Sequence, residues 1–418
     1  MARKVFMSVL GATNYQECQY ADYQTGFKSS KTRFVQVAMF EKFVCGWTAN
    51  DIAYIFLTSG EKGSERKNWF DDGHINRDTK KVIPLCGLQK LLKDLNPSCK
   101  IEPVFIKNGD IETEIWENFR TIFNCLQPND EVYFDITHGF RSLPMLTLVL
   151  NNYSKFLKNI KVASITYGNY EARNEVNEAP IIDLIPLSQL QDWTAAANMF
   201  IKTGNPKSIS ELLKNEEINS LNSFVDEINE CRGLDIYYGK SAIDLKNDLE
   251  RVNIHNHSFK ELLDKVGEKV NLFKPNDIIN GFRAVDFCIQ YQLIQQGVTL
   301  LQEFIVSFIL KDINEENWLN DFERTIVSGC MSINNLSCFR PSEKSDEERK
   351  KSLEIAQKVF SLPYKKRLSD KVFKGLAHGA RNDLNHGGKR HGPKQTGYFG
   401  EKIKEYFNNT IQILSIKL

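Results

Sequence analysis

The stretch YFDITHGFRSLP, Tyr133–Pro144, runs from an apolar strand through a short polar turn into a helix. Together with Val132, its first residues have the composition of a buried strand that reaches Asp135. Gly139 lets the backbone turn tightly, and Ser142 is of a type that caps helices. In open parallel sheets, ligands bind beyond the carboxyl ends of strands. The stretch therefore predicts an α/β sheet with a polar site at the end of this strand.

The rest of the first ~185 residues repeats this alternation of strand and helix. Short apolar, β-branched runs predict strands at Lys4–Leu10, Ile52–Thr58, Glu102–Ile106, Glu131–Ile136, Lys161–Tyr167 and Ile181–Ile185. Apolar residues three and four apart predict helices between them, at Thr32–Val44, Leu85–Leu95, Thr113–Leu126 and Pro144–Leu157. This pattern is typical of βαβ units and predicts an α/β domain with a parallel sheet over residues 1–186.

From Leu187 onward the sequence contains only helical patterns, so residues 187–418 are predicted to be all-α. The expected helices are Leu187–Thr203, one or more within Ser208–Gly233, and then Ser241–Arg251, Phe259–Val270, Val285–Leu310, Glu347–Phe360 and Gly400–Leu418. A chain of 418 residues is also too long for one compact core, which agrees with two domains.

Net charge and cysteine spacing limit the classes of protein that fit this sequence. The net charge is +1, so no whole-chain excess points to nucleic acid or membranes. Pro341–Leu418, however, contains 17 Lys and Arg against 9 Asp and Glu, which either attracts polyanions or forms a solvated helical surface. The nine cysteines form no Cys-x-x-Cys pair, which predicts reduced thiols in a cytoplasmic protein and no metal site. The longest apolar run, Tyr291–Leu310, is too polar to span a bilayer.

Two segments predict a binding site at the strand ends. After the first strand, Gly11 permits close backbone approach, and Thr13 and Asn14 offer a hydroxyl and an amide. After the strand that contains Asp135, the start of the next helix exposes unpaired N–H groups that suit a phosphate, and Arg141 adds a planar cationic donor. Neither G-x-G-x-x-G nor a P-loop motif is present, so a dinucleotide or P-loop site is not expected.

Asp135-x-Thr137-His138-Gly139 resembles the DxTHG signature of CRISPR-associated sensor proteins with a CARF domain, a Rossmann-like fold. VFMSVLGATNY near the start and VASITYGNYEA at Val162–Ala172 agree with this resemblance. It implies that a cyclic oligoadenylate, with four adenylates expected rather than six, binds across a homodimer. The contacts that it implies come from two loops: Gly11, Ala12, Thr13 and Asn14, and Thr137, His138, Gly139, Phe140 and Arg141.

A second motif lies near the C-terminus, in AHGARNDLNHGGKRHG at Ala377–Gly392. Arg381 and His386 have the Arg-x4-His spacing of HEPN ribonucleases, whose domains are all-α, and CARF followed by HEPN is similar to the architecture of CRISPR ancillary ribonucleases. RNA carries its own nucleophile, the 2′-hydroxyl, so a catalyst needs a phosphate clamp and an acid or base. Arginine and histidine supply both without a metal. The resemblance implies Arg381 and His386 as catalytic residues, with Asn382 in a weaker orienting role.

Helix geometry constrains how this pair can act. Five residues along a regular helix rotate two side chains by about 140° relative to each other, so Arg381 and His386 would not converge on one straight helix. Either the helix is broken near Gly379, Gly387 or Gly388, or the site is shared across a dimer, which the resemblance favours. His378 and His391 are close enough in sequence to act as RNA contacts instead of His386.

The sequence thus predicts a cytoplasmic homodimer that acts as a type III CRISPR ancillary effector in antiviral defence, with no cofactor. Cyclic oligoadenylate would activate metal-independent cleavage of single-stranded RNA. One alternative is an inactive module that binds the ring and serves to dimerise or dock partners. Another is a sensor that also cleaves its own ring, with help from Thr13 or His138. The sequence leaves open the RNA preference and whether dimers assemble further.

Overall fold

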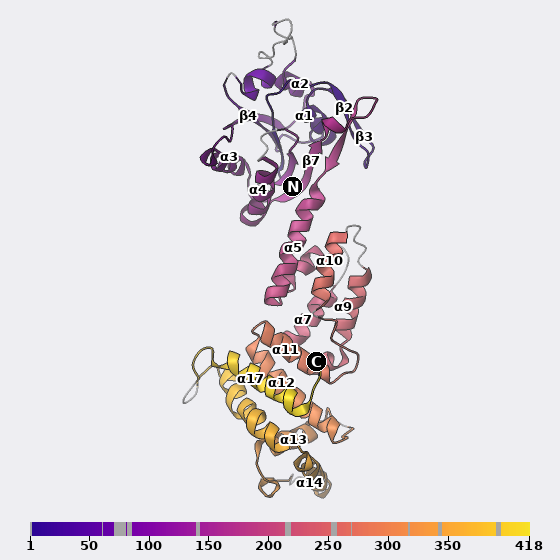
Figure 1. Cartoon of the computed structure of the whole chain (residues 1–418), viewed down its shortest axis with the longest axis vertical. Coiled ribbons are helices and arrows are strands. Elements are labelled where there is room, and N and C mark those ends of the chain that lie inside the picture. The colour runs from indigo at the N-terminus through magenta and orange to yellow at the C-terminus, as the bar shows by residue number, and fades with distance from the viewer. Residues whose placement is uncertain are drawn as a thin grey trace. The chain divides into compact units, whose positions relative to one another are not determined.

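The computed structural model describes residues 2–60, 62–70, 81, 86–138, 143–213, 219–251, 257–268, 270–316, 318–341, 345–389 and 394–418. The chain forms two compact units, Met1–Gln189 and Leu190–Leu418. Figure 1 shows the α/β unit in indigo to magenta and the helical unit in magenta to yellow. Each unit is described by itself below.

The first unit contains one eight-stranded sheet with the order β3-β2-β8-β7-β6-β1-β4-β5. The strands are β1 (Lys4–Val9), β2 (Cys18–Asp22), β3 (Phe27–Thr32), β4 (Ile52–Thr58), β5 (Lys100–Ile106), β6 (Glu131–Asp135), β7 (Lys161–Gly168) and β8 (Glu178–Asp183). The five strands from β7 to β5 are mutually parallel, which confirms the expected α/β domain with a mostly parallel sheet.

Helices cover both faces of this sheet because the central strand is apolar on both sides. In β1, Val5, Met7 and Val9 pack into one core, whereas Phe6 packs into the opposite core. One face carries α3 (Glu112–Cys125) and α4 (Leu143–Lys158), which lie side by side in Figure 1. The other face carries α1 (Val35–Met39), continued by a π-helical turn at Phe40–Val44, and α2 (Leu88–Asp94).

At one edge the sheet departs from the parallel arrangement that the sequence predicts. Strand β8 runs antiparallel to β7, and β2 and β3 form an antiparallel hairpin between the first strand and the first helix. Gly26, at φ +75°, closes that hairpin, and the carboxylate of Asp22 accepts hydrogen bonds from the backbone N–H groups of Gln24 and Thr25. The polar composition of Phe27–Thr32 hid this edge strand, because only one of its faces meets the core.

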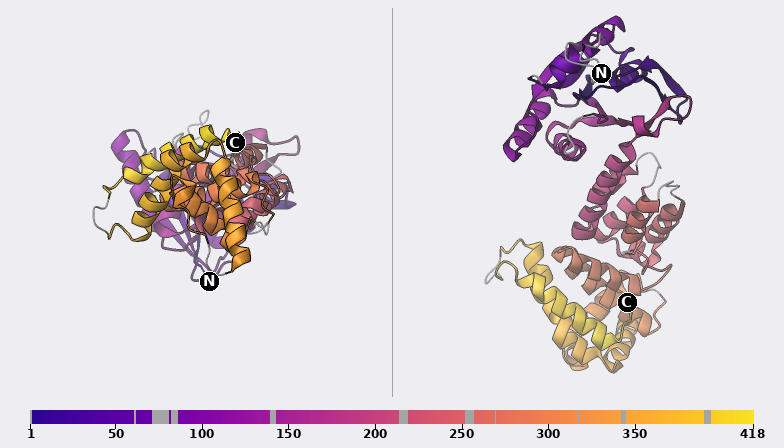
Figure 2. Two further views of the ribbon diagram at one scale, coloured as in Figure 1. Left: turned by 90° about the horizontal axis from the view of Figure 1, so that it is seen from below. Right: turned by 45° about the horizontal axis from the view of Figure 1, so that its top comes forward.

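The described part of the second unit is helical, which confirms the expected all-α region. Its helices are α5 (Ile185–Thr203, which begins in the first unit), α6 (Lys207–Leu212), α7 (Ser220–Asn229), α8 (Gly233–Tyr238), α9 (Lys240–Arg251), α10 (His257–Gly267), α11 (Ile279–Gln290), α12 (Ile294–Asp312), α13 (Asp321–Ser332), α14 (Asp346–Ser361), α15 (Lys365–Leu368), α16 (Arg381–Asn385) and α17 (Tyr398–Leu414). Helix α12 is central and contacts α11, α13, α16 and α17; Figures 1 and 2 show the yellow α17 beside it.

The single helix expected at Val285–Leu310 is in fact two helices. A turn at Tyr291–Leu293 separates α11 from α12, with Gln292 in the left-handed region at φ +59°. The N–H of Leu293 bonds to the carbonyl of Cys288 at 2.8 Å and closes the turn. The apolar pattern continues through the turn because both helices face the same core, so periodicity alone did not reveal the break. No described helix is long and apolar enough to cross a membrane.

Candidate functional site

The loops that follow β1 and β6 meet where the strand order of the sheet reverses. Strand β1 pairs with β4 on one side and with β6 on the other, so the chain winds outward in both directions from this point. Such a reversal opens a crevice beyond the carboxyl ends of the two strands. A Cβ atom placed on Gly11 would lie 3.7 Å from Cβ of His138, which shows how closely the loops approach.

Asp135 holds the β6 loop to its neighbours. Its buried carboxylate accepts hydrogen bonds from the Ser8 hydroxyl at 2.6 Å and from the Thr137 backbone N–H at 3.0 Å, and the Thr137 hydroxyl also donates to it. The Thr137 hydroxyl in turn accepts from the N–H of Gly168, at the end of β7, at 2.8 Å. Burial raises the pKa of the Asp135 carboxyl, against the opposing effect of these hydrogen bonds. The acid of the motif is therefore structural: it links three strand ends.

The β1 loop is fixed by a residue that the sequence did not reveal. The side-chain amide of Asn68, which is fully buried, donates to the carbonyl oxygen of Gly11 at 2.7 Å and to that of Thr13 at 2.9 Å. These bonds leave the Thr13 and Asn14 side chains exposed. Gly11 is needed for a second reason, since a Cβ there would lie only 2.0 Å from the hydroxyl oxygen of Tyr15. Tyr15 thus lies directly over the Gly11 backbone.

His138 and Tyr15 stack, with ring centroids 4.2 Å apart and ring planes 29° apart. Burial lowers the pKa of His138 to about 4 and raises that of Tyr15 to about 12, so both rings are neutral at pH 7. The Nε2 atom of His138 is buried and has no hydrogen-bond partner in the described part of the chain. A neutral imidazole with an unsatisfied nitrogen can donate or accept one hydrogen bond.

A cavity of about 290 Å³ lies over these loops. Its lining residues are Thr13, Asn14, Tyr15, Gln16, Tyr20, Arg33, Thr137, His138, Tyr167, Gly168, Tyr170 and Glu171. Four of them were predicted as ligand contacts from the sequence: Thr13, Asn14, Thr137 and His138. Predicted Gly11 and Ala12 belong to the described β1 loop beside the cavity. Predicted Gly139, Phe140 and Arg141 lie outside the described residues.

Several lining residues were missed as individual contacts. Tyr167, Tyr170 and Glu171 fall within Val162–Ala172, a stretch whose resemblance to the family was already a signal. Arg33 was missed as a site residue because it lies at the start of a stretch whose apolar spacing predicts a helix. Its guanidinium is buried, lies 4.5 Å from the centroid of the Phe34 ring and donates to the Cys86 carbonyl at 3.0 Å.

In the second unit, the structure places Arg381 at the first position of the short helix α16, next to α12. Its Nη1 atom donates to the Glu303 carboxylate at 3.1 Å, and both side chains are about one-third exposed. The next residue, Asn382, is exposed, whereas Asp383 is buried and accepts from the Lys394 backbone N–H at 3.0 Å.

His386 lies where α16 ends. Its side chain is exposed, and its backbone N–H bonds to the Asn382 carbonyl at 3.1 Å. Gly387 and Gly388 follow in left-handed conformations, at φ +58° and +73°. The helix is therefore continuous from Arg381 to Asn385 and breaks only at His386. No interaction within the described residues joins Arg381 to His386.

A cavity of about 620 Å³ adjoins this motif. Its lining residues include Gly387, Gly388, Lys394 and Lys404, together with the apolar side chains of Leu384 and Phe399.

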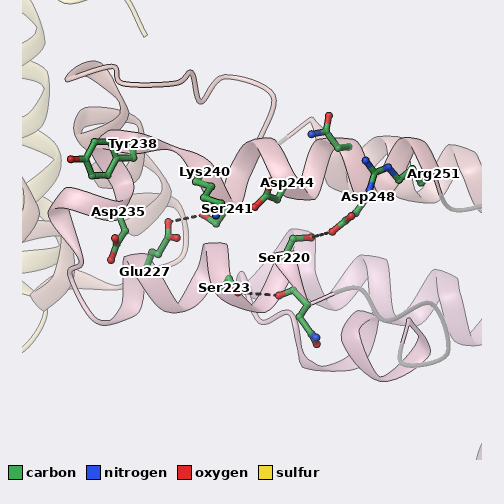
Figure 3. A pocket seen from close by; sticks show the side chains of 12 residues that line it. Ser220, Ser223, Glu227, Asp235, Tyr238, Lys240, Ser241, Asp244, Asp248 and Arg251 are labelled. Atoms are coloured by element: carbon green, nitrogen blue, oxygen red, sulfur yellow. Dashed lines mark hydrogen bonds between the residues drawn. The ribbon is translucent and has the colours of Figure 1, made fainter.

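A larger cavity, of about 690 Å³, lies between α7 and α9 and contains neither motif. There the Ser220 hydroxyl donates to Asp248, and the Ser241 hydroxyl donates to Glu227 (Figure 3).

The described residues contain no group of three or more His, Cys, Asp or Glu side chains that could hold a metal ion.

The family comparison shows what the first unit is similar to. The family model for the CARF domain of the CRISPR system endoribonuclease Csx1 matches residues 5–171. The matched residues lie within the N-terminal unit, which we therefore name the CARF domain after the family that it resembles. The family model for the second domain of CRISPR-associated protein MJ1674 matches residues 189–276, directly after the CARF domain.

Two further likenesses were found. CRISPR-associated protein MJ1674 of Methanocaldococcus jannaschii is 37% identical over 149 residues, which cover 34% of this chain and 23% of that protein. The chain thus spans about a quarter of the length of the curated relative that it matches. The structure of Enterococcus italicus Csm6 bound to cyclic hexa-2′-fluoro-hexa-dAMP aligns with a TM-score of 0.48 and 12% identity, over 99% of this chain and 94% of that one.

Proposed function

We propose that the CARF domain binds a cyclic oligoadenylate and that the ring controls an RNA-cleaving site in the helical unit. The observation that carries the first part is the convergence of the β1 and β6 loops at one cavity in a CARF domain. Tyr15 and Tyr170 offer aromatic faces for adenine bases, and Thr13 and Asn14 offer polar groups. The Arg33 guanidinium and the N-terminal end of α4 suit the ring phosphates.

We further propose a homodimer formed through α4. Its outer face carries Met145, Val149, Tyr153 and Phe156, which are 73%, 54%, 45% and 86% exposed. These residues recur every three or four positions, so they form one apolar stripe on the helix. A contiguous exposed apolar stripe is typical of an interface. A two-fold axis through this helix would present two copies of the cavity, which fits a ring with an even number of adenylates.

Arg381 and His386 are the proposed catalytic residues, with Asn382 in an orienting role. The partly exposed guanidinium of Arg381 is suited to clamping a phosphate, and the exposed imidazole of His386 is suited to acid–base catalysis, so the 2′-hydroxyl of RNA can attack without a metal. The adjoining cavity has Lys394 and Lys404 among its lining residues, beside Asp383 and Glu401, and the two lysines are available to contact the RNA backbone. Because no interaction among the described residues joins Arg381 to His386, the proposal places one pair from each protomer in a shared site.

Activation by the ring follows from thermodynamic linkage between ring binding and the conformation of the dimer. The ring must bind the cleaving form of the dimer more tightly than the resting form, and the ratio of the two affinities sets the gain in activity. In this role the protein would act as an ancillary ribonuclease of type III CRISPR defence, with the ring as activator and single-stranded RNA as substrate. The flexible backbone of single strands can adopt the in-line geometry that a duplex restrains.

The test is a binding assay of the full chain with cyclic tri-, tetra- and hexa-adenylate, followed by RNA cleavage in the same tube. The proposal expects one even-membered ring to bind most tightly and to stimulate cleavage of single-stranded RNA. Tight binding without stimulation would favour a module that binds the ring but does not cleave RNA.

A second candidate activity, cleavage of the ring by the CARF domain itself, is favoured by the unsatisfied Nε2 of His138 beside the cavity. A neutral imidazole there could accept the proton of a ring 2′-hydroxyl. Linear adenylates would appear in the same tube if this activity is present, and their absence would remove this candidate.

A further inference from the structure

Glu303 bridges two arginines in the helical unit. It lies on α12, and its Oε1 atom accepts from Arg381 Nη1 at 3.1 Å. Its Oε2 atom accepts from Arg324 Nη2, on α13, at 2.7 Å. One carboxylate thus joins the arginine of the Arg-x4-His motif to a second arginine 57 residues earlier in the sequence.

Arg324 is held by several contacts besides this one. Its Nη1 atom donates to the Ser307 hydroxyl at 2.7 Å and to the Trp318 carbonyl at 3.3 Å, and its Nη2 atom also donates to the Glu303 carbonyl at 3.1 Å. Only 18% of its side chain is exposed, whereas Glu303 is 39% exposed. Arg324 is therefore a fixed anchor for the Glu303 carboxylate, which would otherwise be free to rotate at the surface.

Arg381 keeps most of its donors available. Within the described residues its guanidinium makes a single hydrogen bond, the one to Glu303, although it carries five N–H groups. A guanidinium held through one corner retains an edge with two parallel N–H groups for the oxygens of a phosphate. A contact that fixes a group in advance lowers the cost of orienting it during reaction.

We propose that Glu303 is a positioning residue of the ribonuclease site and that it acts through Arg381, with Arg324 as its anchor. This inference rests on the proposed function and adds two residues to it. Glu303 does not touch the RNA in this account. It sets the direction of the Arg381 guanidinium so that the phosphate is clamped as negative charge develops on it.

The opposite role for the same contact is a latch, in which Glu303 neutralises Arg381 until the activator releases it. The two roles predict opposite effects on the cleavage rate when the carboxylate charge is removed. A positioning residue gives slower cleavage with activator present, whereas a latch gives faster cleavage without activator.

The experiment compares single-turnover cleavage of a single-stranded RNA by the full chain with and without a saturating cyclic oligoadenylate. The variants are Glu303→Gln, Arg324→Met and Arg381→Ala. Glu405→Gln is the matched control, because that glutamate also pairs with a cation on a helix surface of the same unit, Lys402 at 2.5 Å. Glutamine retains the shape of glutamate, so Glu303→Gln should fold, and Arg324→Met provides a second route to the same disruption.

We expect Glu303→Gln and Arg324→Met to lower the cleavage rate constant by roughly 10- to 100-fold, the cost typical of a misplaced catalytic group. The concentration of RNA at half-maximal rate should change by less than about threefold, since binding of the RNA chain depends on many contacts. Glu405→Gln should cleave like the wild type. This separation of rate from binding is not expected from a merely structural role, which would lower the melting temperature and the amount of active protein.

Two results overturn the inference while leaving the proposed function intact. In one, Arg381→Ala abolishes cleavage but Glu303→Gln and Arg324→Met keep the wild-type rate. In the other, Glu303→Gln cleaves faster than the wild type without activator, which would establish the latch. If Arg381→Ala itself retains the full rate, the proposed function fails, and the inference fails with it.

Discussion

The imidazole of His138 stacks on the phenol ring of Tyr15, with 4.2 Å between the ring centroids. This contact joins the loop that follows β1 to the loop that follows β6, and both rings line the cavity of the CARF domain. A ligand that enters the cavity therefore meets two loops that are already in contact. Such preorganisation reduces the entropy lost when the ligand binds.

Gly11→Ala should weaken binding of the cyclic oligoadenylate by about tenfold or more. The added Cβ would lie 2.0 Å from the Tyr15 hydroxyl oxygen, so Tyr15 must move and its stack on His138 is lost. A loss of about 1.4 kcal/mol corresponds to that tenfold change. Isothermal titration with the ring measures it. Gly46→Ala is the matched control, because a Cβ there meets no atom within 4 Å, and it should bind like the wild type.

Thr137→Val should destabilise the CARF domain by about 1–3 kcal/mol. The change keeps the shape of the side chain but removes the hydroxyl that donates to Asp135 and accepts from the Gly168 N–H at 2.8 Å, which leaves polar groups unsatisfied. Urea denaturation of the full chain measures the free energy of unfolding. Thr137→Ser retains the hydroxyl and should lie much closer to the wild type; a Thr137→Val protein as stable as the wild type would show that the hydroxyl contacts do not stabilise the domain.

Acid should destabilise the CARF domain between about pH 6.5 and about pH 4. The pKa of His138 is lowered from 6.5 to about 4 by burial, so in this window the unfolded chain binds a proton that the folded chain does not. The contribution of this group to stability is fully present above pH 6.5 and is lost as the pH falls. Melting temperatures measured from pH 7 to pH 4.5 should fall less steeply for His138→Gln. Parallel curves for the two proteins would show that His138 is already protonated or solvated in the folded state.

Val149→Asp should convert the protein to monomers if α4 forms the dimer interface. The substitution places a charge in the centre of the exposed apolar stripe, where it would be desolvated in a dimer. Light scattering after size-exclusion chromatography gives the mass in solution. Val176→Asp changes an equally apolar, 71% exposed side chain outside that stripe and should leave the mass unchanged. A wild-type protein that is monomeric with and without the ring would contradict the dimer.

The central sheet and the predicted ligand loops could be predicted because their signals are local. Apolar runs marked β1, β4 and β6, and the polar residues directly after β1 and β6 marked the loops. Parallel strands bring their carboxyl ends to one edge, so two distant segments were predicted to share a site. The structure places Thr13 and His138 on one cavity, as this reasoning requires.

The features that the sequence did not predict depend on contacts between distant residues, which no local sequence pattern reveals. Asn68 fixes the β1 loop from a segment 55 to 57 residues away, and nothing in its neighbourhood distinguishes it from other polar residues. Glu303 is one of several polar residues in α12. Its proposed role depends on the fold, which places it beside Arg381 and Arg324. The break between α11 and α12 was missed because both helices contribute apolar residues to one core.

The most direct test of the account measures RNA cleavage by wild-type protein, Arg381→Ala and His386→Ala, each with and without cyclic tetra- or hexa-adenylate and with EDTA present. Arg367→Ala, at an exposed arginine of α15, is the control. The account predicts ring-dependent cleavage by the wild type and the control in EDTA, reduced by roughly 100-fold or more in the other two variants. Cleavage that EDTA abolishes, or that persists in Arg381→Ala and His386→Ala at the wild-type rate, would contradict it.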